Sequence, residues 1–279
     1  MSLFRSARHL VRGGFVGAVA LSLGSGLADC AAAPAPKGLG SQHPSTVIVK
    51  KAPGDNAKPP ITLEYFCLQG LGELPRLILE VTDTPYTSVF HYLQGKWKEY
   101  ATFGQLPVLR DGELLLVESS AIVRHLARKT CIDGSSLEDQ AAVDMYFELS
   151  KDIGGKRAAL HDMANHADAP KIKTYLAAAE SACDGMHFVG GYLTLADVAM
   201  FHQLDVIAQV APAVLDAYPK LGAFVKAFAA QPAMADYLDS PRRVPLSKNE
   251  CGKGNTGLPG YELVKPLRAA TYATVWQGP

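Results

Sequence analysis

The sequence predicts an α/β domain followed by an all-helical domain, both preceded by a segment of different composition. Strand-like and helical patterns alternate over residues 61–129, which favours a small mixed sheet with helices. Residues 137–238 are helical in pattern throughout and rich in alanine. With 279 residues and 48% hydrophobic content, the chain is long enough to bury the cores of two small domains.

Residues 1–57 are expected to be a leader and linker, disordered or cleaved. Residues 1–12 carry three arginines and no acid, as a mitochondrial or plastid transit peptide does. The apolar stretch 13–28 follows these charges as in a secretory signal, and it is shorter than a membrane-spanning helix requires. Organelle import, secretion and a retained anchor therefore stay open as localisations, and residues 34–60 are interpreted as a linker because they are rich in Pro, Lys and Gly.

The first domain begins with a strand, a helix and a second strand. Ile61, Leu63 and Tyr65 alternate with residues of the opposite face, which predicts a strand. The run GELPRLILEVTD, with Pro75 near its start, suits a buried helix. A second strand fits residues 86–92.

The segment 103–129, FGQLPVLRDGELLLVESSAIVRHLARK, predicts a β-hairpin followed by a helix. Two apolar runs flank Asp111-Gly112, a pair that tolerates the positive φ of a tight turn. A helix is expected from Ser119 or Ser120. The strand directions are therefore mixed, and the unit is small.

By pattern alone, the chain is expected to divide into four parts: the leader and linker at 1–57, a first domain at 58–131, a helical domain at 132–243, and a C-terminal extension at 244–279 without an assigned function. Within the helical domain, Thr194 and Asp197 precede an apolar helix with the spacing of a capping box. We interpret this box as structural.

Composition excludes several classes of function. Lys plus Arg equals Asp plus Glu at 27 each, so no global charge attracts nucleic acid or a membrane, except through the leader. The five cysteines are scattered and odd in number, which argues against a disulfide scaffold or a zinc site. The histidines lack metal-ligand spacing and no phosphate-binding glycine loop occurs, so no metal is predicted.

Three motifs resemble one known family: YFCLQGLGELPR, the segment 103–129, and HFVGGYLTLADV. They are similar to motifs of the cytosolic-type glutathione S-transferases, tyrosine-type and closest to the pi and sigma classes, over about Ile61 to Val244. The resemblance implies a thioredoxin-like first domain that binds glutathione as co-substrate. It also implies an acceptor-substrate site against the helical domain, and a homodimer.

The resemblance assigns catalysis to Tyr65, whose hydroxyl would donate a hydrogen bond to the glutathione thiolate. Such a bond to a charged group contributes about 1.5 to 3 kcal/mol. A core tyrosine is the structural alternative, and the surrounding motif favours catalysis. The residues implied to bind glutathione are Tyr92, Lys98, Gln105, Leu106, Pro107, Glu118, Ser119 and Asp152.

Each part of glutathione has its implied partners. Pro107 follows a cis peptide bond in this family, and the backbone of Leu106 would pair with the cysteinyl part, with Gln105 beside it. Glu118 and Ser119 lie where a helix begins, a place that favours an anion, and they would hold the γ-glutamyl ammonium and carboxylate.

The remaining partners lie further along the chain or across a dimer. Tyr92 and Lys98 match the positions that bind the glycine carboxylate. Asp152 matches the acid that reaches across the dimer to the γ-glutamyl ammonium.

Two residues bear on the level of activity. Leu71 stands where pi and sigma enzymes commonly have an arginine that supports the thiolate, so weaker activation is expected. Cys67 is an alternative nucleophile, as in omega-class and dehydroascorbate reductase relatives, but it is out of place relative to their motif. We interpret Cys67 as a small buried hydrophobe.

The leading hypothesis is a glutathione transferase that conjugates a hydrophobic electrophile in detoxification. One alternative is a glutathione-dependent isomerase of the prostaglandin D synthase kind, which would use the same site. The other alternative is a non-catalytic ligand carrier or structural protein, which Leu71 and the C-terminal extension favour.

Overall fold

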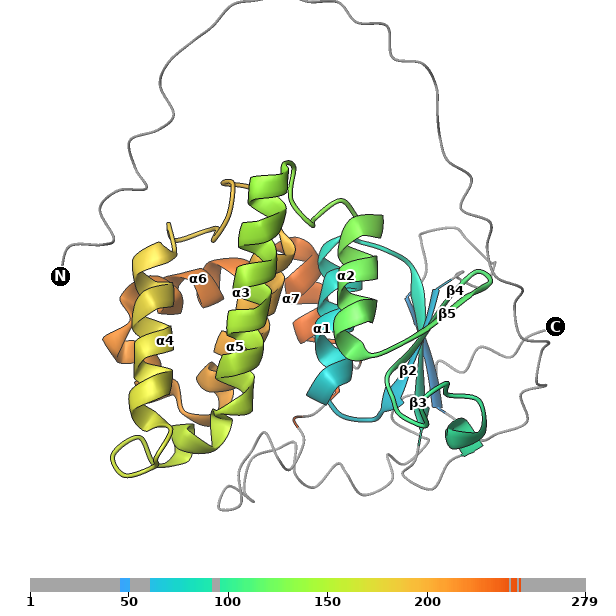
Figure 1. The fold of residues 1–279 in the computed structure, drawn as a ribbon, viewed down its shortest axis with the longest axis horizontal. Coiled ribbons are helices and arrows are strands. Elements are labelled where there is room, and N and C mark those ends of the chain that lie inside the picture. The colour runs from blue at the N-terminus through green and yellow to red at the C-terminus, as the bar shows by residue number, and fades with distance from the viewer. Residues whose placement is uncertain (1–45, 51–60, 92–95, 241, 245, 247–279) are drawn as a thin grey trace, which may run out of the picture. The chain divides into compact units, whose positions relative to one another are not determined.

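A mixed five-stranded sheet makes up the first part of the fold (Figure 1). The structure, a computed structural model, describes residues 46–50, 61–91, 96–240, 242–244 and 246. The strand order is β1-β3-β2-β4-β5, in which β2 and β3 are parallel and all other neighbours are antiparallel. The strands are Thr46–Lys50 (β1), Ile61–Phe66 (β2), Tyr86–His91 (β3), Val108–Asp111 (β4) and Leu114–Val117 (β5).

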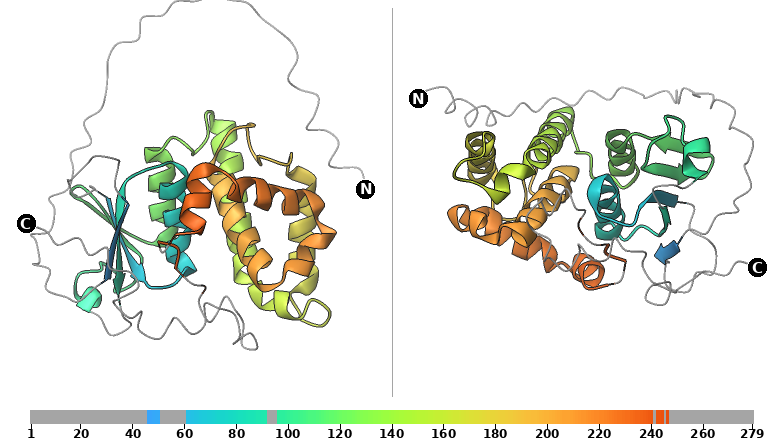
Figure 2. Two further views of the ribbon diagram at one scale, coloured as in Figure 1. Left: turned by 180° about the vertical axis from the view of Figure 1, so that it is seen from behind. Right: turned by 90° about the horizontal axis from the view of Figure 1, so that it is seen from below.

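Helices cover one face of the sheet and form the second part of the fold (Figure 2). Helices α1 and α2 pack side by side on that face, and α5 and α7 contact α1. The helices are Gly70–Val81 (α1), Ser119–Lys129 (α2), Leu137–Gly155 (α3), Ala169–Ala182 (α4), Leu195–Val210 (α5), Pro219–Ala229 (α6) and Pro232–Leu238 (α7), with 3-10 helices at Lys96–Glu99, Arg157–His161 and Pro212–Ala217. The predicted order of an α/β domain followed by an all-helical region is confirmed.

The sheet and α1 form where the apolar pattern predicted them. Ile61 and Leu63 of β2 are almost fully buried and belong to the same core as Leu77 and Ile78 of α1. In the β-hairpin, Asp111 pairs with Leu114 across the turn that follows β4. The glycine of that turn has a φ of 57°, which a glycine adopts without strain.

The predicted capping box is present at the start of α5. The Asp197 carboxylate accepts a hydrogen bond from the Thr194 backbone N–H at 2.7 Å. Its other oxygen accepts the backbone N–H of Phe188 at 2.8 Å. Both residues of the box are fully buried, so the box anchors a loop and a helix start inside the helical core.

Strand β1 corrects our interpretation of residues 34–60 as a linker. It pairs antiparallel with β3 and extends the sheet at that edge. Its sequence, TVIVK, begins with four β-branched residues, which favour a strand. The surrounding Pro, Lys and Gly residues obscured this short signal.

Parts of the predicted extensions lie outside the described residues. These parts include residues 1–45 and most of the extension 244–279. At the start of that extension, Val244 and Leu246 are buried, and the carbonyl of Val244 accepts a hydrogen bond from the side chain of Gln69 at 3.0 Å. Val244 therefore contacts the domain that contains α1, whereas Leu246 packs against Val206 of α5.

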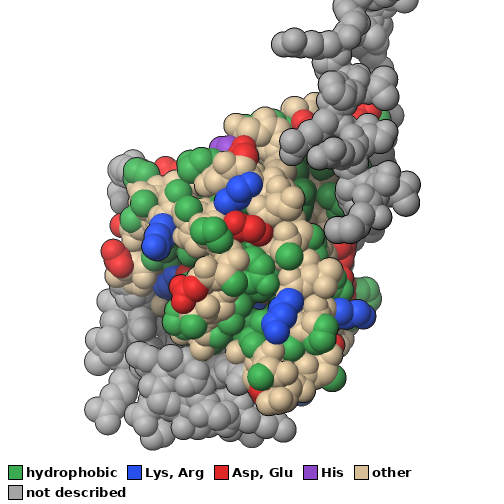
Figure 3. Space-filling model, turned by 90° about the vertical axis from the view of Figure 1, so that its left-hand side faces the viewer, with side chains coloured by type: hydrophobic (Ala, Val, Ile, Leu, Met, Phe, Trp, Pro, Cys, Tyr) green, Lys and Arg blue, Asp and Glu red, His purple; other side chains and the backbone are tan. Residues whose placement is uncertain are grey.

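Acidic and basic side chains alternate on the face shown in Figure 3, with no patch of one sign. This distribution agrees with the equal totals of acidic and basic residues. Within the described ranges, no helix combines the length and the hydropathy that crossing a membrane requires. In the same ranges, no group of three or more His, Cys, Asp and Glu side chains is placed to hold a metal ion.

Candidate functional site

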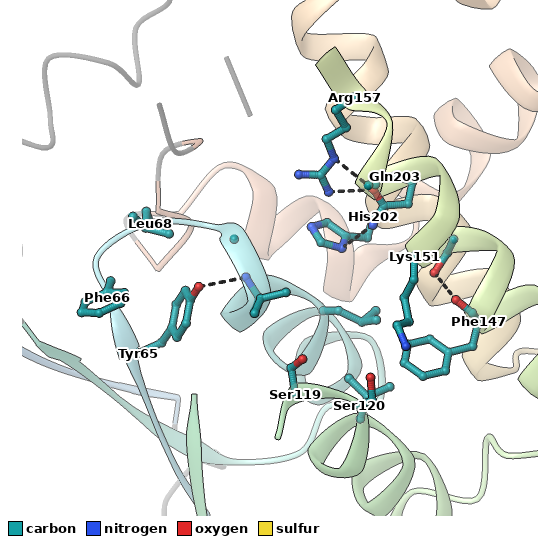
Figure 4. Close-up of a pocket in the computed structure, with 17 residues that line it drawn as sticks. Tyr65, Phe66, Leu68, Ser119, Ser120, Phe147, Lys151, Arg157, His202 and Gln203 are labelled. Atoms are coloured by element: carbon teal, nitrogen blue, oxygen red, sulfur yellow. Dashed lines mark hydrogen bonds between the residues drawn. The ribbon is translucent and has the colours of Figure 1, made fainter. Parts of the chain in front are cut away.

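A cavity of about 620 Å³ lies between the α/β domain and the helical region (Figure 4). One wall comes from the end of β2 and the starts of α1 and α2, and we call it the sheet wall. The other wall comes mainly from α3 and α5, and we call it the helical wall. The lining residues are Tyr65, Phe66, Leu68, Gly70, Leu71, Leu74, Ser119, Ser120, Val123, Phe147, Ser150, Lys151, Gly154, Gly155, Arg157, His202 and Gln203.

Tyr65 lies at the carboxyl end of β2 and lines the cavity, although only 7% of its surface is exposed. Its hydroxyl oxygen accepts a hydrogen bond from the backbone N–H of Leu71 at 3.1 Å, which fixes the position of the hydroxyl (Figure 4). This bond uses an oxygen lone pair and does not use the hydroxyl hydrogen. The tyrosine therefore has a defined orientation at the cavity, as a residue that meets a ligand requires.

Two glycines at the start of α1 let the ring of Tyr65 pack closely against the helix. A Cβ atom at Gly72 would lie 2.5 Å from Cδ1 of Tyr65, closer than any real contact of this kind. A Cβ atom at Gly70 would lie 2.8 Å from the Tyr65 hydroxyl, and Gly70 has a positive φ of 44°. The sequence Gly-Leu-Gly after β2 is thus part of the geometry of the tyrosine.

The start of α2 brings two more of the predicted residues to this region. Ser119 is the first residue of α2 and lines the cavity, together with Ser120. Glu118 precedes them with φ 69° and ψ 110°, a conformation that non-glycine residues adopt only at a cost of roughly 1–3 kcal/mol. Such strained positions cluster at functional sites, and here the strain turns the chain from β5 into the helix.

The segment before β4 packs against Tyr65 of the sheet wall. The Leu106–Pro107 peptide bond is cis, as the resemblance implied. Leu106 is buried in a cluster with Tyr65 and Trp97, while Gln105 is exposed. Leu106, Pro107 and Gln105 are not among the residues that line the cavity.

Two further predicted residues, Lys98 and Asp152, are likewise not among the residues that line the cavity. Lys98 is exposed, and its ammonium lies 5.5 Å from the centre of the Trp97 ring. Asp152 is exposed on α3, one residue beyond the cavity-lining Lys151. Tyr92 lies outside the described residues.

Leu71 and Cys67, the two residues that bear on the level of activity, differ in their position relative to the cavity. Leu71 lines the cavity with 59% of its surface exposed, so no arginine occupies that position. Cys67 does not line the cavity, and burial raises the pKa of its thiol to about 11, although Arg76 opposes this shift. A thiol of that pKa is a poor source of thiolate near neutral pH.

The helical wall holds polar residues that the sequence interpretation missed. The guanidinium of Arg157 donates to Oε1 of Gln203 from Nε at 3.1 Å and from Nη2 at 2.6 Å. The side-chain amide nitrogen of Gln203 lies 3.2 Å from Nδ1 of His202. The only signal in the sequence was the pair His202-Gln203 in the middle of an apolar helix.

Charge and burial differ along this wall. Burial lowers the pKa of His202 well below 6.5, and Arg157 lowers it further, so the imidazole is neutral. Lys151 lies beside the Phe147 ring and forms an ion pair with Glu148 at 2.8 Å. Two cationic residues line the cavity, and none of the described lining residues is acidic, which favours anionic ligands.

Comparison with known proteins gives one consistent family. A glutathione S-transferase N-terminal domain model matches residues 61–128, and a glutathione S-transferase C-terminal domain model matches residues 156–241. The chain is 30% identical over 208 residues to glutathione S-transferase P of Bos taurus, which covers 70% of this chain and 99% of that protein. It is 31% identical over 206 residues to glutathione S-transferase P of Caenorhabditis elegans, which covers 69% of this chain and 99% of that protein.

Solved structures agree with these sequence matches. The pi-class glutathione S-transferase of Onchocerca volvulus has a TM-score of 0.60 and 30% identity to this chain. The match covers 68% of this chain and 99% of the solved one.

Proposed function

This chain belongs to the glutathione S-transferase family, and we propose that it is an active transferase in which Tyr65 stabilises the glutathione thiolate. The thiol proton would leave to solvent, the thiolate sulfur would attack an apolar electrophile, and the leaving group would depart with its electron pair. The thiolate is required because a thiol is a weak nucleophile at its ordinary pKa of about 8.5.

The position of the Tyr65 hydroxyl is the observation that carries this proposal. It lies at the cavity and accepts the Leu71 N–H, and a hydroxyl that accepts one hydrogen bond donates a stronger one. A hydrogen bond from it to the sulfur anion would favour the thiolate by about 1.5 to 3 kcal/mol, or roughly one to two pKa units.

Glutathione is proposed to bind along the sheet wall. Ser119, at the start of α2, would accept the γ-glutamyl carboxylate, since the helix N-terminus favours an anion, and Glu118 would hold the ammonium. The backbone of Leu106 would pair with the cysteinyl part, with Pro107 and Gln105 beside it.

The ends of the glutathione site are proposed from the resemblance alone. Lys98 and Tyr92 would bind the glycine carboxylate. Asp152 is exposed on α3, as an acid that reaches a partner subunit must be.

We also propose a homodimer. Phe103, an aromatic residue in the segment before β4, has 64% of its surface exposed, and such a side chain gains by burial in a partner. Sedimentation of the full chain at micromolar concentration tests this proposal. A monomer mass at all concentrations would contradict it.

A non-catalytic, glutathione-binding protein is the second candidate, and Leu71 is the observation that favours it. The family arginine would add positive charge beside the sulfur, and a leucine cannot do so. The two candidates share the binding site and differ in whether the bound thiol is activated.

Titration of the bound thiol separates these candidates. We would measure the ultraviolet thiolate absorbance of glutathione bound to the full chain against pH, for the wild type and for Tyr65→Phe. We expect a bound pKa below that of free glutathione, which rises by roughly one to two units in Tyr65→Phe.

Tyr192→Phe is the matched control, because Tyr192 bonds to Ser135 and Asp139 and does not line the cavity. Like Tyr65→Phe, it removes the ultraviolet absorbance of one tyrosine, but it leaves the site unchanged. A bound pKa equal to that of free glutathione in the wild type would assign the protein to the non-catalytic class.

A further inference from the structure

His202 presents an unusual polar atom on the helical wall. The side chain lines the cavity and is only 4% exposed. Its Nε2 atom is buried and has no hydrogen-bond partner among the described residues. Because buried polar atoms are almost always paired, an unpaired one at a cavity indicates a group that a ligand completes.

The neighbouring side chains define Nε2 of His202 as a donor. Oε1 of Gln203 accepts two hydrogen bonds from Arg157, so the amide nitrogen of Gln203 faces His202 (Figure 4). The reverse orientation would set the amide N–H groups against the guanidinium, with donors facing donors. The amide nitrogen only donates, so Nδ1 of His202 accepts, and the neutral ring carries its proton on Nε2.

The backbone of α3 leaves room for this arrangement. A Cβ atom at Gly154 would lie 2.9 Å from Oε1 of Gln203, so the glycine allows Gln203 to approach the helix. Gln203 is 6% exposed, and its contacts keep the series Arg157, Gln203, His202 in one orientation. The donor at the end of this series is therefore fixed before a ligand arrives.

The local charge selects the kind of acceptor that would bind. Arg157 and Lys151 line the same cavity, and within the described part of the chain no acidic residue lines it. An anionic oxygen accepts a stronger hydrogen bond than a neutral one, and the nearby cations favour its charge. Phe147 also lines the helical wall, and its ring suits contact with an aromatic or aliphatic part of a ligand.

We propose that His202, oriented by Gln203 and Arg157, binds a carboxylate on the electrophilic second substrate, so that the preferred substrates are apolar electrophiles that carry one carboxylate. This inference rests on the proposed transferase function and names the substrate class of that site. His202 is a specificity-determining residue, and Gln203 and Arg157 are positioning residues.

A matched pair of electrophiles tests the proposal: 4-chloro-3-nitrobenzoate and its neutral carboxamide. In both, the glutathione sulfur forms a bond to the chlorine-bearing carbon, the C–Cl bond breaks, chloride leaves with the electron pair, and the thiol proton goes to solvent. The two compounds differ only in the group that meets His202. Each variant is compared with the wild type on each compound, so the different intrinsic reactivities cancel.

We expect His202→Leu in the full chain to lower kcat/KM at least tenfold more for the carboxylate than for the carboxamide. His202→Gln should recover most of that selectivity, because the Gln amide nitrogen lies close to the place of Nε2 and donates a hydrogen bond. Equal losses on the two compounds, or no loss on either, would overturn the assignment. Thermal melting of each variant shows whether an equal loss comes from the fold.

Binding of the two reaction products separates this inference from the proposed function. S-(4-carboxy-2-nitrophenyl)glutathione and its carboxamide need no catalysis, and calorimetry measures their affinities for the wild type and for His202→Leu. Glutathione bound with an activated thiol, but equal affinity for the two products, would retain the transferase and overturn the carboxylate site. Failure to bind glutathione itself would overturn both.

Discussion

The sheet wall and the helical wall enclose the same cavity, but they hold their polar side chains by different means. On the sheet wall, the Tyr65 hydroxyl is held by the backbone of Leu71, six residues along the chain. On the helical wall, Arg157 holds Gln203 from 46 residues away. One wall is organised by a local motif and the other by helix packing.

This difference separates two kinds of information in the sequence. Where a local backbone shape positions a side chain, the residues that make the shape are adjacent in the sequence and form a recognisable pattern. Where packing of two helices positions it, the partners have no fixed spacing. From the sequence we therefore named Tyr65 and Ser119 of the sheet wall, and we named no residue of the helical wall.

The largest expected effect concerns the charged cluster that joins the two parts of the fold. Glu73 of α1 accepts hydrogen bonds from Arg76 at 2.8 Å and from Tyr237 of α7 at 2.9 Å, and all three residues are at most 1% exposed. Arg76→Met would remove the cation that donates a hydrogen bond to the buried Glu73 carboxylate. We expect the free energy of unfolding, from urea titration, to fall by about 3 to 5 kcal/mol.

The double variant Glu73→Leu with Arg76→Met is the control, because it removes both charges together. Replacing a whole buried pair by apolar residues costs far less than breaking it, so the double variant should be more stable than Arg76→Met alone. A double variant less stable than the single one would contradict this account of the cluster.

The next effect tests the local organisation of the sheet wall. Gly72→Ala places a methyl group 2.5 Å from Cδ1 of Tyr65, and the ring must move away from α1. We expect kcat/KM for a neutral electrophile to fall at least tenfold, which corresponds to about 1.4 kcal/mol. Steady-state kinetics with 1-chloro-2,4-dinitrobenzene measures this loss.

Gly222→Ala is the matched control for a glycine within a helix. A Cβ atom at Gly222 would make only an ordinary contact of 3.9 Å, with the carbonyl of Leu215, so activity should be retained. Equal kinetics in Gly72→Ala and the wild type would show that close packing of Tyr65 against α1 is not needed.

The smallest effect concerns pH and the helical wall. His202 is neutral in the folded protein because burial lowers its pKa well below 6.5. Above pH 6.5 the histidine is neutral in the unfolded chain as well, so protonation of His202 costs the folded protein no stability there. As the pH falls below 6.5, the unfolded chain gains a proton that the folded protein excludes, so stability decreases by up to about 1.4 kcal/mol per pH unit.

Comparison of the wild type with His202→Gln between pH 7.5 and 5.5 tests this sign. The groups that face His202 are unchanged in this variant, including Gln203, Arg157, Arg243 and Arg76. We expect a shallower loss of unfolding free energy in acid for His202→Gln. Parallel curves for the two proteins would mean that His202 takes up a proton in the folded state.

Much of the fold followed from the sequence for physical reasons that are local. The alternation in β2, the turn residue Gly112 and the capping box at Thr194 each act within a few residues, so pattern alone predicted them. The sequence did not predict strand β1, because its five residues lie among Pro, Lys and Gly. Its partner β3 is also distant in the chain, since Thr46 pairs with Phe90, 44 residues further on, and no local pattern indicates such a pairing.

By itself, the sequence determined the order of the elements, the tyrosine at the end of β2 and the serine at the start of α2. Each depends on the backbone preferences of residues that are neighbours in the sequence. Only the tertiary structure decided that His202, Gln203 and Arg157 line the cavity of Tyr65. Their arrangement depends on how α5 packs against α1 and α3, and that packing buries apolar side chains of all three helices in one core.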